Sequence, residues 1–290
     1  MPTNEIKKYA VVIPHYDDVA RLRICLDALC AADLDDIDVV VVDNGSLQGL
    51  SEIIASFQKV RFLTEPRKGA ANARNRGVSE TNSPYLFFLD SDCVPAQGWL
   101  SVARSVVSGA DIIGGRIDVF DETAPPRSGP QAFEAVFGFD QQAYIEAKGF
   151  SVTANLLTSR KVFEDVGPFR SGVSEDLDWC LRAGAKGYKL SYEDRLCVGH
   201  PSRGNWRDLS RKWRRLNTES FSLTGVGPKA RIVRALRALV MPISILAHAP
   251  KVLRCKELSA SEKLRGLGTL AGIRMSRMIW MLRQAITGRA

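Results

Sequence analysis

The sequence predicts a doubly wound α/β fold with a mainly parallel sheet, followed by a basic helical region. Apolar runs alternate with segments of helical spacing over the first hundred residues, and the runs are continuous, as in strands buried on both faces. The charge balance also changes along the chain. Residues 1–202 carry 21 Lys and Arg against 28 Asp and Glu, whereas residues 203–290 carry 19 against 4. We therefore expect a catalytic domain over residues 1–205 and a basic amphipathic helical region over residues 206–290.

Strands are predicted where apolar residues run without interruption, and helices where they recur every three or four positions. The predicted strands cover residues 10–13, 39–42, 60–63, 85–89, 112–115 and 188–192. The predicted helices cover residues 19–32, 50–57, 69–78, 162–166 and 177–185, and the chain is helical from residue 206 on. Residues 122–130 are rich in Pro, Gly and charge, and predict a mobile loop.

Composition narrows the class of protein. A hydrophobic content of 45% supports a sizeable core and argues against disorder. The six cysteines include no C-x-x-C pair, which favours a reduced, cytoplasmic protein without a zinc site. The polar N-terminus does not resemble a secretory signal, and no apolar run reaches the roughly 18 residues of a transmembrane helix.

Acidic residues follow the apolar run Tyr85–Leu89 directly, at Asp90 and Asp92. Unpaired carboxylates are costly inside a sheet, so this pair should lie where the strand leaves it, at the edge where open α/β sheets bind ligands. Asp43 ends the strand at 39–42 and should lie at the same edge. Carboxylates there could hold a divalent cation, and the cation a diphosphate. Asp-rich turns that start or cap a helix explain the same residues.

The segment Glu65–Gly77 combines basic and small residues. Arg67 and Lys68 precede a predicted helix, where positive charge opposes the helix dipole but suits a bound phosphate. The small residues that follow allow the helix to approach a sheet or a ligand closely. Taken alone, the segment is equally consistent with an ordinary packing helix.

Five segments, in order, resemble the motifs of family 2 glycosyltransferases with the GT-A fold. They are Val11–Asp17, Val41–Ser46, Lys68–Gly77, Phe88–Asp92 and Glu175–Arg182, the last preceded by the similar segment Val162–Phe169. Each segment is weak by itself, but their order and spacing are specific. The resemblance covers about residues 9–202 and implies direct, inverting transfer of a sugar from a nucleotide-sugar donor.

The resemblance implies a donor site and a site for Mn²⁺ or Mg²⁺. The residues implied for the donor are Pro14, Tyr16, Asp17, Asp43, Arg67, Gly69, Arg74, Asp90 and Gly115. Those implied for the metal are Asp92, Asp90 and His200. The cation would stabilise the charge that develops on the leaving diphosphate. A histidine that follows a strand is also often structural.

The resemblance makes Asp176 the general base, with Glu175 beside it, and gives Asn155 a contact with the acceptor. A sugar hydroxyl is a poor nucleophile, so a carboxylate must take its proton. The alternative for the acidic pair is electrostatic: acids at the start of a helix are favoured by the helix dipole.

The basic region over residues 206–290 lies outside most of the resemblance. Arg and Lys crowd around Trp206 and Trp213, and an apolar run over residues 239–247 is broken by Pro242. Basic helices with apolar faces are typical of the surface of an anionic membrane. The alternative is a bundle packed on the catalytic domain or on a second copy of the chain, as in a homo-oligomer. No nucleic-acid-binding fold accompanies the charge, so we expect no nucleic-acid partner.

We therefore expect a metal-dependent inverting glycosyltransferase with a nucleotide-sugar donor, a UDP-sugar, and a glycan or lipid-linked acceptor. It would serve polysaccharide or cell-envelope synthesis as a peripheral protein at the inner face of the plasma membrane. One alternative is a sugar nucleotidyltransferase, which usually carries a Gly-rich loop where this chain has Pro14-His15-Tyr16. The other is a non-catalytic nucleotide- or glycan-binding scaffold, against which the intact acids argue.

Overall fold

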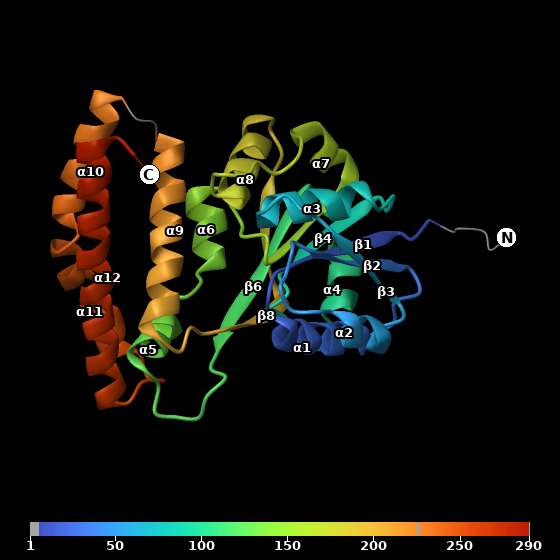
Figure 1. Ribbon diagram of the computed structural model, residues 1–290, viewed down its shortest axis with the longest axis horizontal. Helices are drawn as coiled ribbons and strands as arrows, with labels where there is room; N and C mark the ends of the chain where they lie inside the picture. The colour runs from blue at the N-terminus through green and yellow to red at the C-terminus, as the bar shows by residue number, and fades with distance from the viewer. Residues whose placement is uncertain (1–5, 225–226, 290) are drawn as a thin grey trace. The chain divides into compact units, whose positions relative to one another are not determined.

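The computed structural model describes residues 6–224 and 227–289, and the chain divides into two compact units (Figure 1). The first comprises Met1–Asp118, Asp140–Ser171 and Glu175–His200. The second comprises Val119–Phe139, Gly172–Ser174 and Pro201–Ala290. A segment from the middle of the sequence therefore groups with the C-terminal helices.

An eight-stranded sheet organises the described part of the first unit, in the order β3-β2-β1-β4-β7-β6-β8-β5. Its strands are β1 (Tyr9–His15), β2 (Ile37–Asp43), β3 (Val60–Thr64), β4 (Tyr85–Leu89), β5 (Val94–Pro95), β6 (Ile112–Phe120), β7 (Asn155–Ser159) and β8 (Leu190–Pro201). Strands β3, β2, β1 and β4 pair in parallel, whereas β7 pairs antiparallel with both β4 and β6. The strand order changes direction beside β1, which creates the switch point where such sheets bind ligands.

Helices cover both faces of the sheet because its strands are apolar on both sides. The helices of this unit are α1 (Val19–Cys30), α2 (Ser51–Ser56), α3 (Ala70–Ser79), α4 (Trp99–Val106), α6 (Gln141–Lys148), α7 (Arg160–Val166) and α8 (Glu175–Ala185). Figure 1 shows α1 and α2 on one face, and α3 and α7 on the other. Ala10 and Val12 of β1 join the core beneath α3, α7 and α8, which includes Phe88, Phe163 and Trp179.

The expected α/β fold with C-terminal helices is confirmed, but the middle of the chain differs from the prediction. A strand predicted at residues 188–192 is present, but its bounds are wrong: β8 runs from Leu190 to Pro201. Its charged, partly exposed residues Glu193, Asp194 and Arg195 hide the apolar pattern of a strand. Strand β7 and helices α4, α5 and α6 were not predicted.

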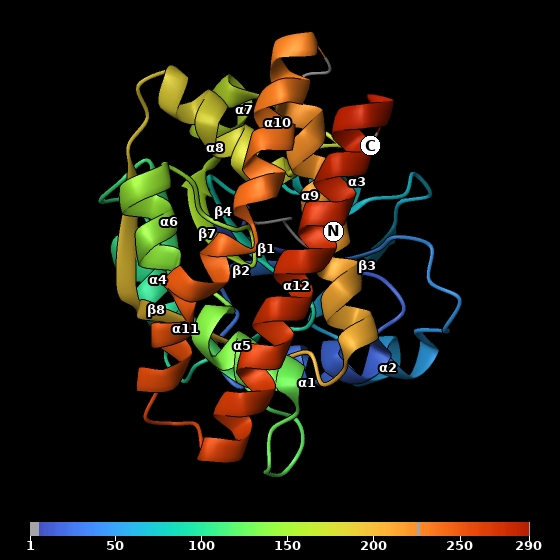
Figure 2. The ribbon, with the colours of Figure 1, turned by 90° about the vertical axis from the view of Figure 1, so that its left-hand side faces the viewer.

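The second unit is helical (Figure 2). Its helices are α5 (Gly129–Phe137), α9 (Trp206–Thr224), α10 (Pro228–Val240), α11 (Ile243–Arg254) and α12 (Ala260–Thr287). Helix α12 packs along the other four around a core that includes Phe133, Leu209 and Leu270. Capping boxes at Ser128 and Ser259 fix the starts of α5 and α12.

Among the described residues, no single helix combines the length and the apolar character of a membrane span. Helices α10 and α11 meet that test only together, as a pair bent by 50°.

Candidate active site

The carboxyl ends of β1, β2 and β4 carry the predicted donor residues. His15 pairs with Asp43 at the ends of β1 and β2, and Val12 with Phe88 of β4. The loops after β1 and β2, the start of α3 and the acids after β4 therefore emerge at one edge of the sheet. This is the edge that the sequence predicted.

The loop after β1 is tied to the loop after β2 by Asp17. Its Oδ1 accepts hydrogen bonds from the backbone N–H groups of Leu47, at 2.6 Å, and Gln48, at 3.1 Å. Its own N–H donates to Ser46 Oγ at 2.8 Å. The hydrogen bond from Gln48 keeps the pKa of Asp17 below its ordinary value, so the brace holds as a carboxylate. The backbone of Asp17 is left-handed, with φ +48°, a conformation that Asp tolerates better than most residues.

The rings of Pro14 and Tyr16 and the carboxylate of Asp43 lie at the ends of β1 and β2, where the two braced loops begin. Pro14 is buried, whereas Tyr16 is 54% exposed and has the ammonium group of Lys68 4.6 Å from its ring centroid. Asp43 accepts hydrogen bonds from the backbone and the hydroxyl of Ser46, at 3.2 and 2.5 Å. Asp43 therefore builds a turn, as its alternative reading predicted, while its half-buried carboxylate stays at the sheet edge.

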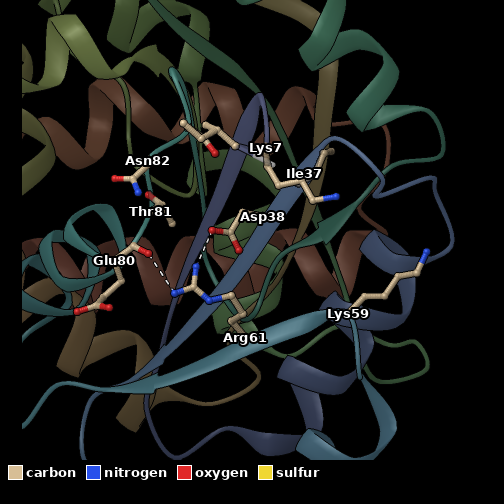
Figure 3. Close-up of a pocket in the computed structure, with 10 residues that line it drawn as sticks. Lys7, Ile37, Asp38, Lys59, Arg61, Glu80, Thr81 and Asn82 are labelled. Carbon is tan, nitrogen blue, oxygen red and sulfur yellow. Dashed lines mark hydrogen bonds and ion pairs between the residues drawn. The ribbon is translucent and has the colours of Figure 1, made fainter. Parts of the chain in front are cut away.

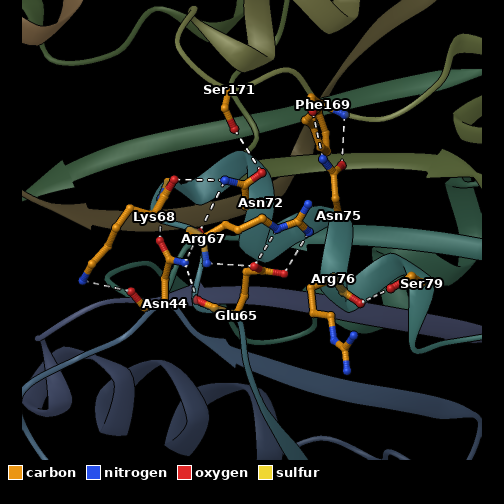
Figure 4. A network of polar contacts seen from close by, with 11 residues as sticks. Asn44, Glu65, Arg67, Lys68, Asn72, Asn75, Arg76, Ser79, Phe169 and Ser171 are labelled. Atoms are coloured by element: carbon orange, nitrogen blue, oxygen red, sulfur yellow. Dashed lines mark hydrogen bonds and ion pairs between the residues drawn. The ribbon is translucent and has the colours of Figure 1, made fainter.

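Asn44 is a positioning residue that the sequence analysis did not single out (Figure 4). It is buried, and its amide donates to the carbonyls of Glu65 and Arg67, both at 2.8 Å. Its Oδ1 accepts from the N–H of Gly69 at 2.6 Å. One side chain thus fixes the loop that leads into α3. Its place in an Asp-Asn-Gly-Ser turn was the one available signal.

The start of α3 carries Arg67 and Gly69. Arg67 forms a two-pronged ion pair with Glu65, with Nε to Oε1 at 2.9 Å and Nη2 to Oε2 at 3.1 Å. This pairing lowers the pKa of Glu65 to about 2. Gly69 caps the helix with φ +120°, which favours glycine. Arg67, which was predicted to face a bound phosphate, is therefore paired with the carboxylate of Glu65. The Arg67 side chain remains 71% exposed.

Helix α3 also anchors the segment that precedes α8. Asn75 exchanges hydrogen bonds with the backbone of Phe169, at 2.8 and 2.9 Å, and Asn72 accepts from Ser171 Oγ at 3.1 Å (Figure 4). These contacts connect the donor side of the site with the approach to the predicted base.

Arg74 lies at the centre of the site. Its side chain is 4% exposed, and its Nη2 and Nη1 contact Asp90 Oδ1 at 2.5 Å and Glu175 Oε1 at 2.9 Å. Burial acts to lower the pKa of Arg74, but the two carboxylates outweigh it, so that the pKa is raised. The sequence implied only that Arg74 shapes the nucleotide pocket. The structure shows that it joins the acids after β4 to the acids that open α8.

Asp92 and His200 form the pair best suited to a divalent cation. His200 Nε2 lies 3.5 Å from Asp92 Oδ2, with side-chain exposures of 7% and 29%. In residues 6–224 and 227–289, however, no three His, Cys, Asp or Glu side chains are grouped closely enough to hold a metal. The predicted third ligand, Asp90, is engaged by Arg74. A carboxylate and an imidazole can hold a divalent cation whose other positions are filled by phosphate oxygens and water, so the pair fits such an ion.

The predicted base opens α8. Asp176 lies in the first turn of that helix with Glu175 and Asp178, and its Oδ1 accepts from the N–H of Leu177 at 2.8 Å. The carboxylate is half-buried. Because Glu175 is engaged by Arg74, the two neighbouring acids have different environments.

Asn155 and Gly115 are packed against each other in the interior of the sheet. Asn155 is fully buried: it accepts from Trp99 Nε1 at 3.0 Å and donates to the carbonyls of Arg116 and Leu196, at 3.0 and 2.8 Å. A side chain so enclosed cannot contact an acceptor, which corrects the expected role. Gly115 is needed because a Cβ there would lie 2.2 Å from both Asn155 Nδ2 and the Leu196 carbonyl oxygen.

A cavity of about 500 Å³ lies at the other end of the parallel strands (Figure 3). Its wall includes Lys7, Lys59 and the ion pair of Arg61 with Asp38, at 2.6 Å. Open α/β sheets bind ligands at the carboxyl ends of their strands, so we do not assign the donor to this cavity.

The comparisons agree with this geometry. The model of the family described as Glycosyl transferase family 2 matches residues 10–171. Glycosyltransferase AglE of Haloferax volcanii is 30% identical over 225 residues, which are 73% of each chain. The pre-mycofactocin glycosyltransferase of Mycobacterium tuberculosis is 28% identical over 214 residues, 70% of this chain and 44% of that protein. The chain thus spans less than half of the second relative.

Solved structures share the fold at low sequence identity. The mannosyltransferase PcManGT of Pyrobaculum calidifontis, in complex with GDP-Man and Mn²⁺, matches with a TM-score of 0.56 and 16% identity, over 98% of this chain and 74% of that one. S. aureus TarS 1–349, in complex with UDP-GlcNAc, matches with a TM-score of 0.53 and 15% identity, over 97% and 92%. The family match and the fold leave the nucleotidyltransferase alternative without support. The chain belongs to glycosyltransferase family 2 and is a glycosyltransferase with the GT-A fold.

Proposed function

We propose that the chain is a metal-dependent, inverting glycosyltransferase that moves a sugar from a nucleotide-sugar donor to a glycan or lipid-linked acceptor. The observation that carries the proposal is the group of acids at the switch point, with Asp92 beside His200 and with Asp90 and Glu175 joined by Arg74. Structural neighbours bound to GDP-Man or UDP-GlcNAc support a nucleotide-sugar donor, and we expect a UDP-sugar. A neighbour bound to Mn²⁺ supports Mn²⁺ or Mg²⁺ as the cofactor.

The proposed donor site follows the edge of the sheet. Pro14, Tyr16 and Asp43 would receive the base and the ribose, in a loop that Asp17 holds in place. Asp92 and His200 would hold the cation, which when bound stabilises the negative charge on the leaving diphosphate. Arg74 would keep Asp90 and Glu175 in position while the donor binds.

The proposed transfer is a single displacement. The acceptor hydroxyl oxygen forms a bond to the anomeric carbon as the bond from that carbon to the diphosphate oxygen breaks. Asp176 takes the hydroxyl proton, and the nucleoside diphosphate leaves with the bonding electrons. A positioned general base contributes about 10²–10⁴-fold to the rate of such a step.

We also propose that residues 1–205 act as the catalytic domain and that residues 206–290 attach the enzyme to the anionic inner face of the plasma membrane. Helices α10 and α11 support this because they contain no acidic residue and expose large apolar side chains. Polysaccharide or cell-envelope glycan synthesis would supply an acceptor at such a surface.

Two conservative variants test the proposed catalysis. We expect Asp92→Asn to lose the thermal stabilisation that a UDP-sugar with Mn²⁺ gives the wild type, and EDTA to abolish that stabilisation in the wild type. Asp176→Asn should keep that stabilisation but lose transfer by at least about 10²-fold. The exposed Asp165→Asn serves as the matched control. Full transfer by either active-site variant, or undiminished transfer in EDTA, would refute the proposal.

A further inference from the structure

Three arginines gather in the helical unit without an acidic partner. Arg234 comes from α10, and Arg274 and Arg277 come one helical turn apart from α12. Among the described residues, none of the three forms an ion pair. Arg234 is buried, and Arg274 and Arg277 are half-buried. Arginine is rarely removed from water without a paired carboxylate or phosphate, because the loss of hydration is costly.

Three buried N–H donors in the described part of the helical unit lack an acceptor. The Nε atoms of Arg274 and Arg277 are buried and have no hydrogen-bond partner, and neither does the buried indole N–H of Trp213 on α9. The Arg277 guanidinium lies 4.8 Å from the centre of the Trp213 ring, which places α9 and α12 side by side at this point. Buried donors without acceptors usually mark a missing ligand or ordered water.

The charge of the cluster is not neutralised from within. Burial, with the nearby Arg274 and Arg234, lowers the pKa of Arg277 to about 10. Residues 203–290 contain four acids. Asp208 pairs with Arg211, Glu219 with Arg215, and Glu262 caps α12 and binds the backbone of Arg127. The remaining acid, Glu257, acts on Arg127, whose pKa it helps to raise.

Arg234 differs from the other two in having partners. It is 6% exposed and donates to the side-chain oxygens of Gln284 and Asn217, which are neutral. Its position is therefore fixed, yet its charge is not compensated. Its charge is close enough to Arg277 to help lower the pKa of that residue.

We propose that Arg274 and Arg277, backed by Arg234, form a binding site for a phosphate or diphosphate group. The planar guanidinium fork matches the oxygens of such a group, and an anion would supply the acceptors that the cluster lacks. The group could be carried by a lipid headgroup or by a soluble molecule; the chemistry that recognises it is the same. This site is separate from the donor site at the sheet edge and does not depend on the proposed transfer reaction.

The test compares variants of the full-length chain with two probes. Inorganic diphosphate, in EDTA to remove metal from the donor site, represents a soluble source. Phosphatidylcholine vesicles with and without phosphatidic acid represent a headgroup. Binding is measured by isothermal titration and by vesicle co-sedimentation. Arg277→Gln and Arg274→Gln remove the site, and Arg283→Gln removes the same charge from an exposed position of the same helix.

We expect at least one probe to bind the wild type, and this binding to weaken at least tenfold in Arg277→Gln and in Arg274→Gln but not in Arg283→Gln. Site-dependent binding of diphosphate alone identifies a soluble source; site-dependent binding of vesicles alone identifies a headgroup. Arg277→Lys, which keeps the charge without the fork, should be intermediate and provides a second folded variant. Absence of binding by both probes, or equal weakening in all three Gln variants, would overturn the proposal. A separate titration with a UDP-sugar and Mn²⁺ reports on the donor site, so the two proposals can fail independently.

Discussion

At the scale of single residues, Arg74 connects the two acidic segments that the sequence placed 85 residues apart, at Asp90 and Glu175. A guanidinium can bind two carboxylates at once because its donors point in fixed, diverging directions. An ammonium group offers one point of charge and would have to choose between them. The buried charge is compensated only while both acids are present.

We predict that Arg74→Met destabilises the fold by about 3–5 kcal/mol, because the substitution leaves two partly buried carboxylates without their cation. It should also weaken donor binding, since Asp90 loses its support. Thermal or denaturant unfolding measures the first effect, and titration with a nucleotide sugar the second. Arg76→Met, in the partly exposed i,i+4 pair with Glu80 at the C-terminal cap of the same helix, should change stability by less than about 1 kcal/mol. Equal losses in the two variants would contradict the role given to Arg74.

Buried amides mark the limit of sequence reasoning at this scale. Asn44 and Asn155 both lie inside the unit and use their amide groups to satisfy backbone carbonyls. From the sequence, Asn44 is expected only to form part of a turn, and Asn155 to contact the acceptor. The sequence shows that an amide is present but not which way it faces, because its partners come from strands and loops far away in the chain.

At the scale of elements, α3 depends on a close approach to the sheet. A Cβ on Gly77 would lie 2.4 Å from Val12 Cγ1 and 3.2 Å from Val42 Cγ2. The glycine therefore lets the helix rest on β1 and β2, which keeps Arg74 level with the end of β4. The helix has few apolar residues of its own, so this contact matters to its placement.

We predict that Gly77→Ala destabilises the protein by about 1–3 kcal/mol through overpacking, although alanine is the better helix former. Gly184→Ala in α8 is the matched control. No atom lies within 4 Å of a Cβ built there, so the control should leave stability unchanged or raise it by up to about 1 kcal/mol. Denaturant midpoints at equal m-values measure both. A Gly77→Ala protein as stable as the control would show that α3 can move away from the sheet at little cost.

The strands that were easiest to predict are continuous apolar runs, and the elements that the sequence analysis missed lack a regular apolar pattern. Strands β1, β2 and β4 are continuous apolar runs, because both their faces are covered. Strand β7 is short and contains buried Asn155 and Thr158, while β8 carries charge on its exposed residues. Helix α5 follows a Pro- and Gly-rich stretch, and its buried face includes Gln131 and Glu134. Polar residues satisfied by distant partners removed the periodicity on which the prediction depended.

For the candidate site, the sequence predicted the location but not which side chains pair with one another. Its location followed from where apolar strands end in acids, a local feature. The engagement of Asp90 by Arg74, and of Arg67 by Glu65, depended on side-chain directions that spacing does not give. The pairing of Asp90, the predicted third metal ligand, has the same origin: the resemblance supplied the residue types, and the fold determined which of them were already paired.

At the scale of the whole chain, charge is divided between its parts. The C-terminal residues 203–290 carry a net charge of +15 against −7 for residues 1–202, and helices α10 and α11 contain six Lys and Arg but no acid. The same two helices expose Leu236, Leu239, Ile243 and Leu246 by 59% to 76%. Apolar side chains beside unneutralised basic residues match the two requirements for binding an anionic membrane surface.

We predict that the double variant Leu239→Ser, Leu246→Ser binds phosphatidylglycerol vesicles at least tenfold more weakly than the wild type. Burying an apolar side chain of this size contributes about 1.5–3 kcal/mol, and each nearby basic residue adds about 1 kcal/mol at an anionic surface. Because the second contribution is screened by ions, wild-type binding should also fall when salt is raised from about 0.1 M to 1 M. Co-sedimentation measures both effects. Leu47→Ser, which removes a 92% exposed leucine from the α/β unit, is the matched control and should bind as the wild type does. If the double variant binds as tightly as this control, the exposed face of α10 and α11 serves a protein partner or a second copy of the chain instead.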